Sequence, residues 1–168
     1  GVTQVVTTDT EGDWTASVPP GLVTVDIDDS DPQIPTGAIR TTTGDDPVTV
    51  SVTAGENTPA GSSAGFFLPA TVTGVLYADT NGNGTRQAGE PGLANINVRI
   101  TDSLGNLQIV ETGADGSWTA SVPPGSVEVK VDLADPDSPA DVEQREGTDP
   151  TTVTAVAGQT ISGGNDGY

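Results

Sequence analysis

The sequence predicts an all-β fold of Greek-key β-sandwich repeats, one complete and one lacking its N-terminal third. Two observations lead to this prediction. Short runs rich in Val, Ile and Thr alternate with clusters of Gly, Pro, Asp and Asn, a pattern typical of strands joined by turns. The chain also repeats itself. No stretch shows the 3.6-residue period of an amphipathic helix.

The internal repeat defines two matching segments, which we call the tails. Residues 14–21 and 118–125 both read WTASVPPG. The match extends on both sides of this block, so that 1–66 corresponds to 105–168, with a shift of one residue in the C-terminal part. Repeats of this kind are structural units that contact their neighbours along a stalk or fibre.

One segment, Val72–Leu104, occurs only once, and we call it the head. The head and the second tail make a complete repeat at 72–168. Residues 67–71, which include Pro69, are expected to be a linker, and 1–66 is a tail whose head is missing. Two arrangements remain open from the sequence: a piece of a covalent tandem array, or a polymer in which subunits exchange strands.

The strands expected in the complete repeat are short. The run Val-Glu-Val-Lys-Val at 127–131 alternates apolar and polar residues, which predicts one buried face and places Lys130, the only lysine, in solvent. Trp14 and Trp118 each precede such a run, so both are expected in a core rather than on a sugar-binding surface. Strands are expected at Thr71–Tyr77, Ile96–Thr101, Leu107–Thr112, Ser117–Val122, Val127–Leu133 and Thr151–Ala157.

The composition removes several function classes. The chain has no Cys and no His, so thiolate nucleophiles, imidazole bases and the preferred zinc ligands are missing, and no enzyme is expected. It carries 24 Asp and Glu against 5 Lys and Arg, a net charge of −19, so no basic patch could bind nucleic acid. No apolar run is long enough for membrane insertion. The abundant oxygen ligands suit Ca²⁺, which would also reduce the self-repulsion of the chain.

One motif predicts a calcium site. Residues 79–90 read DTNGNGTRQAGE, which fits the twelve-residue loop D-x-[DN]-x-[DN]-G-x5-E. In such a loop alternate side chains point inward, a glycine allows the sharp turn, a backbone carbonyl binds at the seventh position and a Glu closes the shell. Strands rather than helices flank it, so no helix-pair switch is expected. The expected ligands are Asp79, Asn81, Asn83, Thr85 through its carbonyl and Glu90, with Gln87 acting through water.

Other acidic residues form weaker candidates. Clustered carboxylates repel one another unless a cation bridges them, but Asp-Pro and Asp-Gly pairs also mark ordinary solvated turns, and both readings stay open. The candidates that adjoin sharp turns are Asp102 and Asp115. The clusters that follow a strand are Asp132, Asp135 and Asp137 in the second tail and Asp26, Asp28, Asp29 and Asp31 in the first.

These motifs together resemble the SdrD-type B-repeat, a Cna-B-like, prealbumin-like sandwich of bacterial surface proteins. The resemblance rests on VTGV at 72–75, the calcium loop, GEPGL at 89–93, DGSW at 115–118 and VPPG at 122–125. It implies calcium-rigidified stalk modules with more than one Ca²⁺ each. Many Cna-B-like domains carry a Lys–Asn isopeptide bond, but Lys130 corresponds to Asp26 in the first tail, so the repeats share no such crosslink.

The expected function is therefore mechanical. A calcium-stabilised module of an extracellular surface fibre, filament or adhesin stalk would contact neighbouring repeats or identical subunits end to end. The alternatives are a carbohydrate- or protein-binding adhesin module with an unknown surface ligand, and an accessory sandwich on a secreted enzyme. A row of exposed aromatic residues would favour the first alternative, and the near-identical tails disfavour the second.

Overall fold

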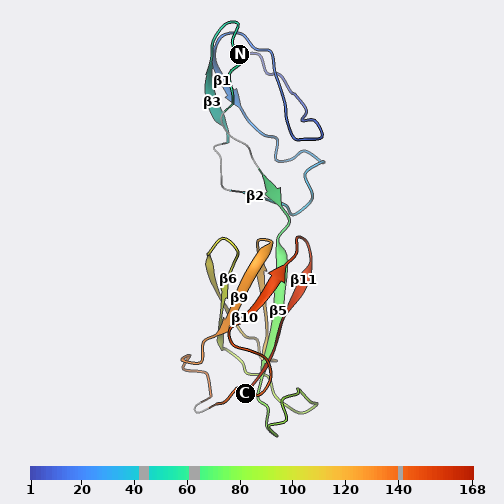
Figure 1. The fold of residues 1–168 in the computed structure, drawn as a ribbon, viewed down its shortest axis with the longest axis vertical. Helices are drawn as coiled ribbons and strands as arrows, with labels where there is room; N and C mark the ends of the chain where they lie inside the picture. The colour runs from blue at the N-terminus through green and yellow to red at the C-terminus, as the bar shows by residue number, and fades with distance from the viewer. Residues whose placement is uncertain (42–45, 61–64, 140–141) are drawn as a thin grey trace. The chain divides into compact units, whose positions relative to one another are not determined.

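The computed structural model describes residues 1–41, 46–60, 65–139 and 142–168. The described residues contain strands, turns and no helix, which confirms the all-β prediction. None of them forms a helix that could cross a membrane. The chain divides into two compact units (Figure 1). Unit 1 comprises Gly1–Ile34 and Thr41–Gly65, and unit 2 comprises Pro35–Arg40 and Phe66–Tyr168.

Unit 2 is a β-sandwich of two sheets. Strands β6, β7 and β8 follow one another around the sandwich and β9 returns beside β6, which is the Greek-key order. The four-stranded sheet has the order β10 (Thr151–Ala155), β9 (Gly125–Val131), β6 (Asn97–Thr101) and β7 (Leu107–Glu111). The three-stranded sheet has the order β11 (Thr160–Gly167), β5 (Ala70–Tyr77) and β8 (Ser117–Val122).

The core lies between these sheets and follows from the alternation in the sequence. Every second residue of β8 and β9 is buried, and Lys130 lies on the exposed face of β9 as expected. The core side chains are Ala70, Val72, Leu76, Ile96, Val98, Ile100, Trp118, Ala120, Val122, Val127, Val129, Val131, Ala155 and Tyr168.

Trp118 explains two glycines in the neighbouring strands. It lies directly opposite Gly74 of β5, where an added Cβ would come within 2.5 Å of the indole ring. At Gly163 of β11 an added Cβ would lie 2.7 Å from the same ring. The indole is therefore packed across β5 and β11, and only glycine leaves room for it.

The six predicted strands of the complete repeat are confirmed, with ends that shift by up to two residues. β5 begins at Ala70, so the last two residues of the expected 67–71 linker belong to a strand. A further short sheet pairs β2 (Ile39–Arg40) with β4 (Phe66–Phe67). Strand β11, which was not predicted from the sequence, pairs in parallel with β5 and contains a bulge between Ser162 and Gly164.

Unit 1 contains one regular hairpin. Strands β1 (Gly21–Val25) and β3 (Val48–Val52) pair in the register that β9 and β10 use in unit 2: Gly21 lies opposite Val52, and Gly125 lies opposite Ala155. The rest of the described first tail forms no strand except β2 and the first residue of β4.

The prediction that Trp14 is buried in a core was wrong. Trp14 is 40 % exposed, whereas Trp118 is 4 % exposed. In unit 2 the head supplies β5, the central strand of one sheet, and β6, an interior strand of the other. Without a head, the counterparts of β7 and β8 have no partner strands among the described residues. Only β1 and β3 keep their pairing, and Trp14 stays partly exposed.

Candidate metal centre

The predicted calcium loop connects β5 to β6, and hydrogen bonds close it at its base. Ala78 N donates to Pro91 O at 2.9 Å, and Leu93 N donates to Leu76 O at 3.0 Å. Asp79 N donates to Tyr168 O at 2.8 Å, which joins the start of the loop to the end of the second tail. The sandwich thus holds the loop at both ends.

Asp79 organises the first half of the loop. Its Oδ1 accepts hydrogen bonds from Gly82 N at 2.8 Å and Asn83 N at 3.2 Å, and its Oδ2 accepts one from Gly84 N at 2.7 Å. Gly84 has a φ of 71°, in the left-handed region that the tight turn requires. Because three backbone N–H groups surround one carboxylate, the chain winds around Asp79 as a calcium loop winds around its first ligand.

The other residues that the motif predicts as ligands are joined to one another by hydrogen bonds. Asn81 Nδ2 donates to Gln87 Oε1 and to Glu90 Oε1, each at 3.2 Å. The second oxygen of Glu90 accepts a hydrogen bond from Gln87 N at 2.9 Å. Asn83 Oδ1 caps Thr85 N at 2.9 Å. All six residues predicted from the motif therefore belong to one hydrogen-bonded ring of oxygen-bearing groups.

The two carboxylates of this ring are removed from water, and both Asp79 and Glu90 are 8 % exposed. The hydrogen bond from the Gly84 backbone is the main influence that lowers the pKa of Asp79, supported by those from Asn83 and Gly82 and opposed by burial. A negatively charged ring rich in oxygen atoms and held by the backbone fits a hard cation of the calcium type. Among the described residues no three Asp or Glu side chains could hold a metal alone, so amide and carbonyl oxygens would have to complete the shell of any cation bound in the loop.

The base of the loop is packed against the turn that precedes β8. A side chain at Gly92 would overlap the backbone of Asp115, and one at Gly116 would overlap Leu76 O. Arg86 reaches from the loop to the same turn and donates to Asp115 O at 3.1 Å. The loop is therefore connected to both sheets, because this turn leads from β7 to β8.

Asp102 and Asp115 lie in separate turns, away from the loop ligands. Asp102 Oδ1 accepts hydrogen bonds from Leu104 N and Asn106 N, both at 2.9 Å, and so caps the turn between β6 and β7. Asp115 accepts hydrogen bonds from Ser117 N at 3.0 Å and Ser117 Oγ at 2.6 Å. Turn capping accounts for these hydrogen bonds of both carboxylates.

The clustered aspartates also make local hydrogen bonds. Asp135 is 9 % exposed and binds Asn97 Nδ2 at 2.5 Å, while its other oxygen accepts the N–H of Asp137 at 2.9 Å. Asp132 accepts from Ala134 N at 3.2 Å and lies 3.8 Å from Arg99 Nε. In unit 1, Asp26 follows β1, Asp28 accepts hydrogen bonds from Ser30, Asp29 follows it directly, and Asp31 accepts one from Gln33 N.

One buried carboxylate, Asp166, was not predicted from the sequence. Asp166 in β11 is 3 % exposed, and its Oδ1 accepts a hydrogen bond from Gln144 Nε2 at 2.9 Å. Burial, followed by the negative charge of Asp149, raises the pKa of Asp166 to about 6. Nothing in the run TISGGNDG indicates burial, because it has no apolar alternation. The signal lies in the glycines, which make room for Tyr77 and Trp118.

No family model matches the chain, and no curated protein matches it. Three solved structures illustrate what it is similar to. The Bacillus anthracis TIE protein has a TM-score of 0.42 at 12 % identity, covering 64 % of this chain and 18 % of that one. GBS52, the minor pilin of Streptococcus agalactiae, has a TM-score of 0.42 at 14 % identity, covering 82 % and 62 %. BcpA*(D312A), the major pilin subunit of Bacillus cereus, has a TM-score of 0.33 at 9 % identity, covering 61 % and 33 %.

The chain spans less than two thirds of the length of each of these proteins. The fold assignment rests on the strand order, register and core of unit 2 itself.

Proposed function

We propose that this protein is a calcium-stabilised structural module of an extracellular surface fibre, filament or adhesin stalk. The observation that carries the proposal is the ring formed by Asp79, Asn81, Asn83, Gln87 and Glu90, which the sandwich holds closed at both ends. Ca²⁺ in this ring would be bound by side-chain oxygens and by the Thr85 carbonyl.

The position of the loop explains how an ion would stiffen the module. The loop joins β5 of one sheet to β6 of the other, and its base contacts the turn before β8 and the end of β11. A cation that fixes the loop would fix four strand ends at once. Binding to the folded state alone contributes roughly 3–4 kcal/mol at 100 to 1,000 times the dissociation constant.

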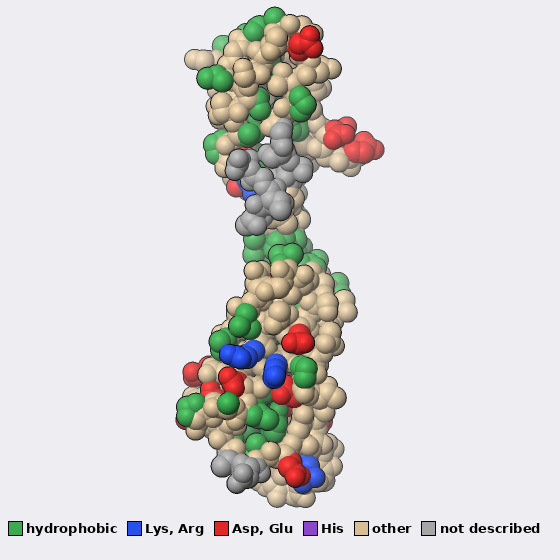
Figure 2. All heavy atoms as spheres, turned by 60° about the vertical axis from the view of Figure 1, so that its left-hand side comes forward, with side chains coloured by type: hydrophobic (Ala, Val, Ile, Leu, Met, Phe, Trp, Pro, Cys, Tyr) green, Lys and Arg blue, Asp and Glu red, His purple; other side chains and the backbone are tan. Residues whose placement is uncertain are grey.

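The surface is consistent with an extracellular role. In Figure 2 only a few basic side chains interrupt the surface of the chain, and the net charge is −19. Bound cations would offset part of the self-repulsion. The chain has no Cys, so metal ions rather than disulfides would supply the crosslinks that a small sandwich needs.

Isothermal titration calorimetry with Ca²⁺ tests the proposal. Glu90→Gln and Asp79→Asn each remove a ligand charge while keeping the side-chain shape, so both are expected to abolish the tightest binding step. Glu128→Gln, a matched change at an exposed position of β9, should leave that step intact. An unchanged titration in Glu90→Gln would show that the loop is not the calcium site.

A further inference from the structure

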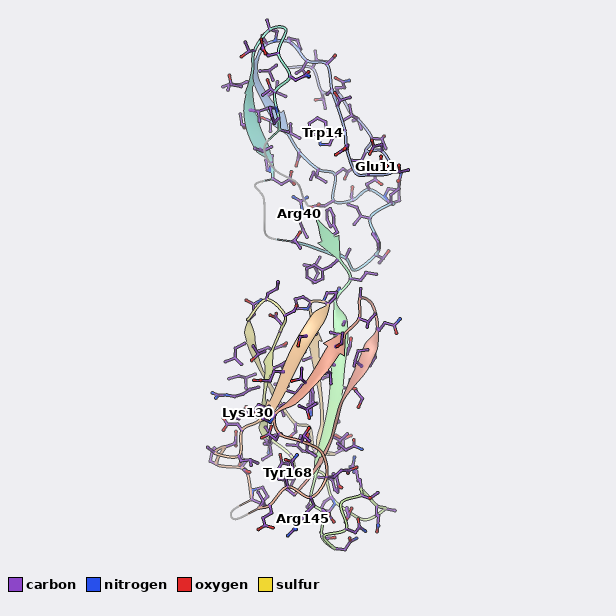
Figure 3. All side chains as sticks on the ribbon, viewed as in Figure 1. Glu11, Trp14, Arg40, Lys130, Arg145 and Tyr168 are labelled. Atoms are coloured by element: carbon purple, nitrogen blue, oxygen red, sulfur yellow. The ribbon has the colours of Figure 1, made fainter. Side chains whose placement is uncertain are left out.

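A segment of the second tail lies against the predicted calcium loop. This segment, residues 142–149, leads into β10, and we call it the strap. An added Cβ at Gly84 of the loop would lie 2.8 Å from the backbone oxygen of Arg145 in the strap. Figure 3 shows Arg145 and Tyr168 at the same end of unit 2. The strap backbone therefore covers the turn that the loop makes around Asp79.

The strap is fixed to the sandwich by contacts that do not involve the loop. Val142 packs against the core cluster. Arg145 N donates to Gly167 O of β11 at 2.7 Å, and Gln144 Nε2 donates to Asp166 Oδ1 at 2.9 Å. Apolar packing and two hydrogen bonds thus hold the strap on the end of β11, where it forms a firm support beside the loop.

The side chain of Tyr77 joins the strap to the loop. Tyr77 ends β5, two residues before Asp79, and is fully buried. Its hydroxyl group donates to Glu146 Oε2 of the strap at 2.6 Å, and its ring packs so closely on β11 that an added Cβ at Gly167 would lie 2.6 Å from it. The guanidinium carbon of Arg86 in the loop lies 5.8 Å from the ring centroid, within cation–π range. One ring therefore contacts the strap, β11 and the loop.

Glu146 also brings a negative charge close to the loop. Burial is the main influence that raises the pKa of Tyr77, followed by the hydrogen bond to Glu146 and by the negative charges of Glu146, Asp79 and Glu90. The hydroxyl group therefore stays a hydrogen-bond donor at neutral pH. No three Asp or Glu side chains in the described part of the chain could hold a metal together, which places Glu146 outside the shell of ligands.

We propose that Tyr77 and Glu146 are positioning residues of the cation site, which hold the loop in its binding geometry without touching the ion. The inference rests on the proposed calcium function and adds two residues that lie outside the twelve-residue motif. A loop that is already ordered loses less conformational freedom when it binds a cation, and site rigidity is one of the properties that set calcium affinity. Groups that orient metal ligands from outside the shell typically change metal affinity 10- to 100-fold.

A purely structural role of the Tyr77–Glu146 hydrogen bond predicts a different result. Loss of the bond would then lower the stability of the metal-free chain, measured by urea unfolding in chelator. The dissociation constant for Ca²⁺ at 25 °C would stay the same as long as the variant is folded. Under the positioning role the dissociation constant itself rises, so the two measurements together separate the two roles.

Calorimetric titration of the full chain with Ca²⁺ makes the comparison. Tyr77→Phe removes only the hydroxyl group, and Glu146→Gln keeps an acceptor oxygen while removing the charge. Each is expected to raise the dissociation constant about tenfold or more. Glu143→Gln is the matched control, because it removes one charge from the same strap at an exposed residue whose side chain pairs with Arg145. This control should bind Ca²⁺ like the unmodified chain.

Amide hydrogen exchange in excess chelator gives a second readout that needs no bound metal. The amides of Gly82, Asn83 and Gly84 donate to Asp79, and they should exchange faster in Tyr77→Phe than in Glu143→Gln, whereas the core amide of Val129 should not change.

The possible failures are distinguishable. An unchanged dissociation constant in Tyr77→Phe and Glu146→Gln, or loop amides that exchange equally in all variants, would overturn the positioning role and leave the calcium function standing. An unmodified chain that binds no Ca²⁺ would overturn both proposals.

Discussion

At the residue scale, the packing of Trp118 explains why glycines, which are poor strand formers, occur inside two strands. Gly74 lies in β5 and Gly163 lies in β11, and both border the indole ring. The sequence could predict a buried tryptophan at this position. It could not predict which residues the ring would contact, because those lie far away along the chain.

Gly74→Ala should therefore destabilise unit 2. The added methyl would lie 2.5 Å from the indole, and overpacking of this kind costs typically 1–3 kcal/mol. Gly113→Ala is the matched control, because its added Cβ finds its nearest neighbour at 3.4 Å, an ordinary contact. Urea unfolding of the two variants measures the difference. Equal stabilities would show that the ring is not packed on β5.

The buried carboxyl group of Asp166 makes the stability of the folded chain fall as the pH rises. Its pKa is about 6 in the folded chain against 3.8 for the ordinary group. Below pH 4 both states are protonated. As the pH rises toward 6 the unfolded state ionises first and stability is lost, on the order of 3 kcal/mol from this group alone.

Asp166→Asn should remove that loss and make the chain more stable at neutral pH, measured by urea unfolding from pH 4 to 7 in the presence of chelator. Asp102→Asn is expected to act in the opposite direction. Burial raises the pKa of Asp102, but the hydrogen bonds from Asn106, Leu104 and Gly105 outweigh it and lower the pKa. Its charge therefore contributes stability that is lost on acidification. A steeper pH dependence in Asp166→Asn would contradict the account.

At the element scale, the two tails show that one sequence forms different structure with and without partner strands. The hairpin of each tail pairs within the tail, so it was predictable and forms in both units. The counterparts of β7 and β8 depend on β6 and β5, so they form strands only in unit 2. The sequence repeat alone led us to expect Trp14 in a core like Trp118, because pattern and propensity carry no information about a missing partner.

The candidate site was predictable for a similar reason. The loop at 79–90 is local, so its spacing alone singled out six residues that the structure joins by hydrogen bonds. The burial and the raised pKa of Asp166 result from tertiary contacts of β11 with Gln144 and Asp149. No local sequence pattern indicates them. The capping roles of Asp102 and Asp115 were visible as turn signals but could not be separated from ligand roles without hydrogen-bond geometry.

The difference in burial between Trp118 and Trp14 predicts different costs for removing each side chain. Trp118→Ala should cost about 3–5 kcal/mol, as for other buried large aromatic residues. Trp14→Ala should cost much less, because its side chain is already 40 % exposed. Calorimetric unfolding of both variants compares them directly. A similar loss for Trp14→Ala would mean that unit 1 has a packed core in solution.

At the scale of the whole molecule, the central claim is that a cation in the loop supplies crosslinking that the small core lacks. Unit 2 contains one compact core cluster and no disulfide, and the chain carries a net charge of −19. Its stability should therefore depend on calcium about as much as on a large core side chain such as Trp118.

Thermal unfolding in millimolar Ca²⁺ and in excess chelator tests this claim most directly. A stabilisation of roughly 3 kcal/mol corresponds to a rise in Tm of about 10–25 °C for a unit of this size. The account predicts a rise of this order that Mg²⁺ reproduces poorly and that Glu90→Gln abolishes. The same Tm in calcium and in chelator would contradict the calcium mechanism and leave only the sandwich fold.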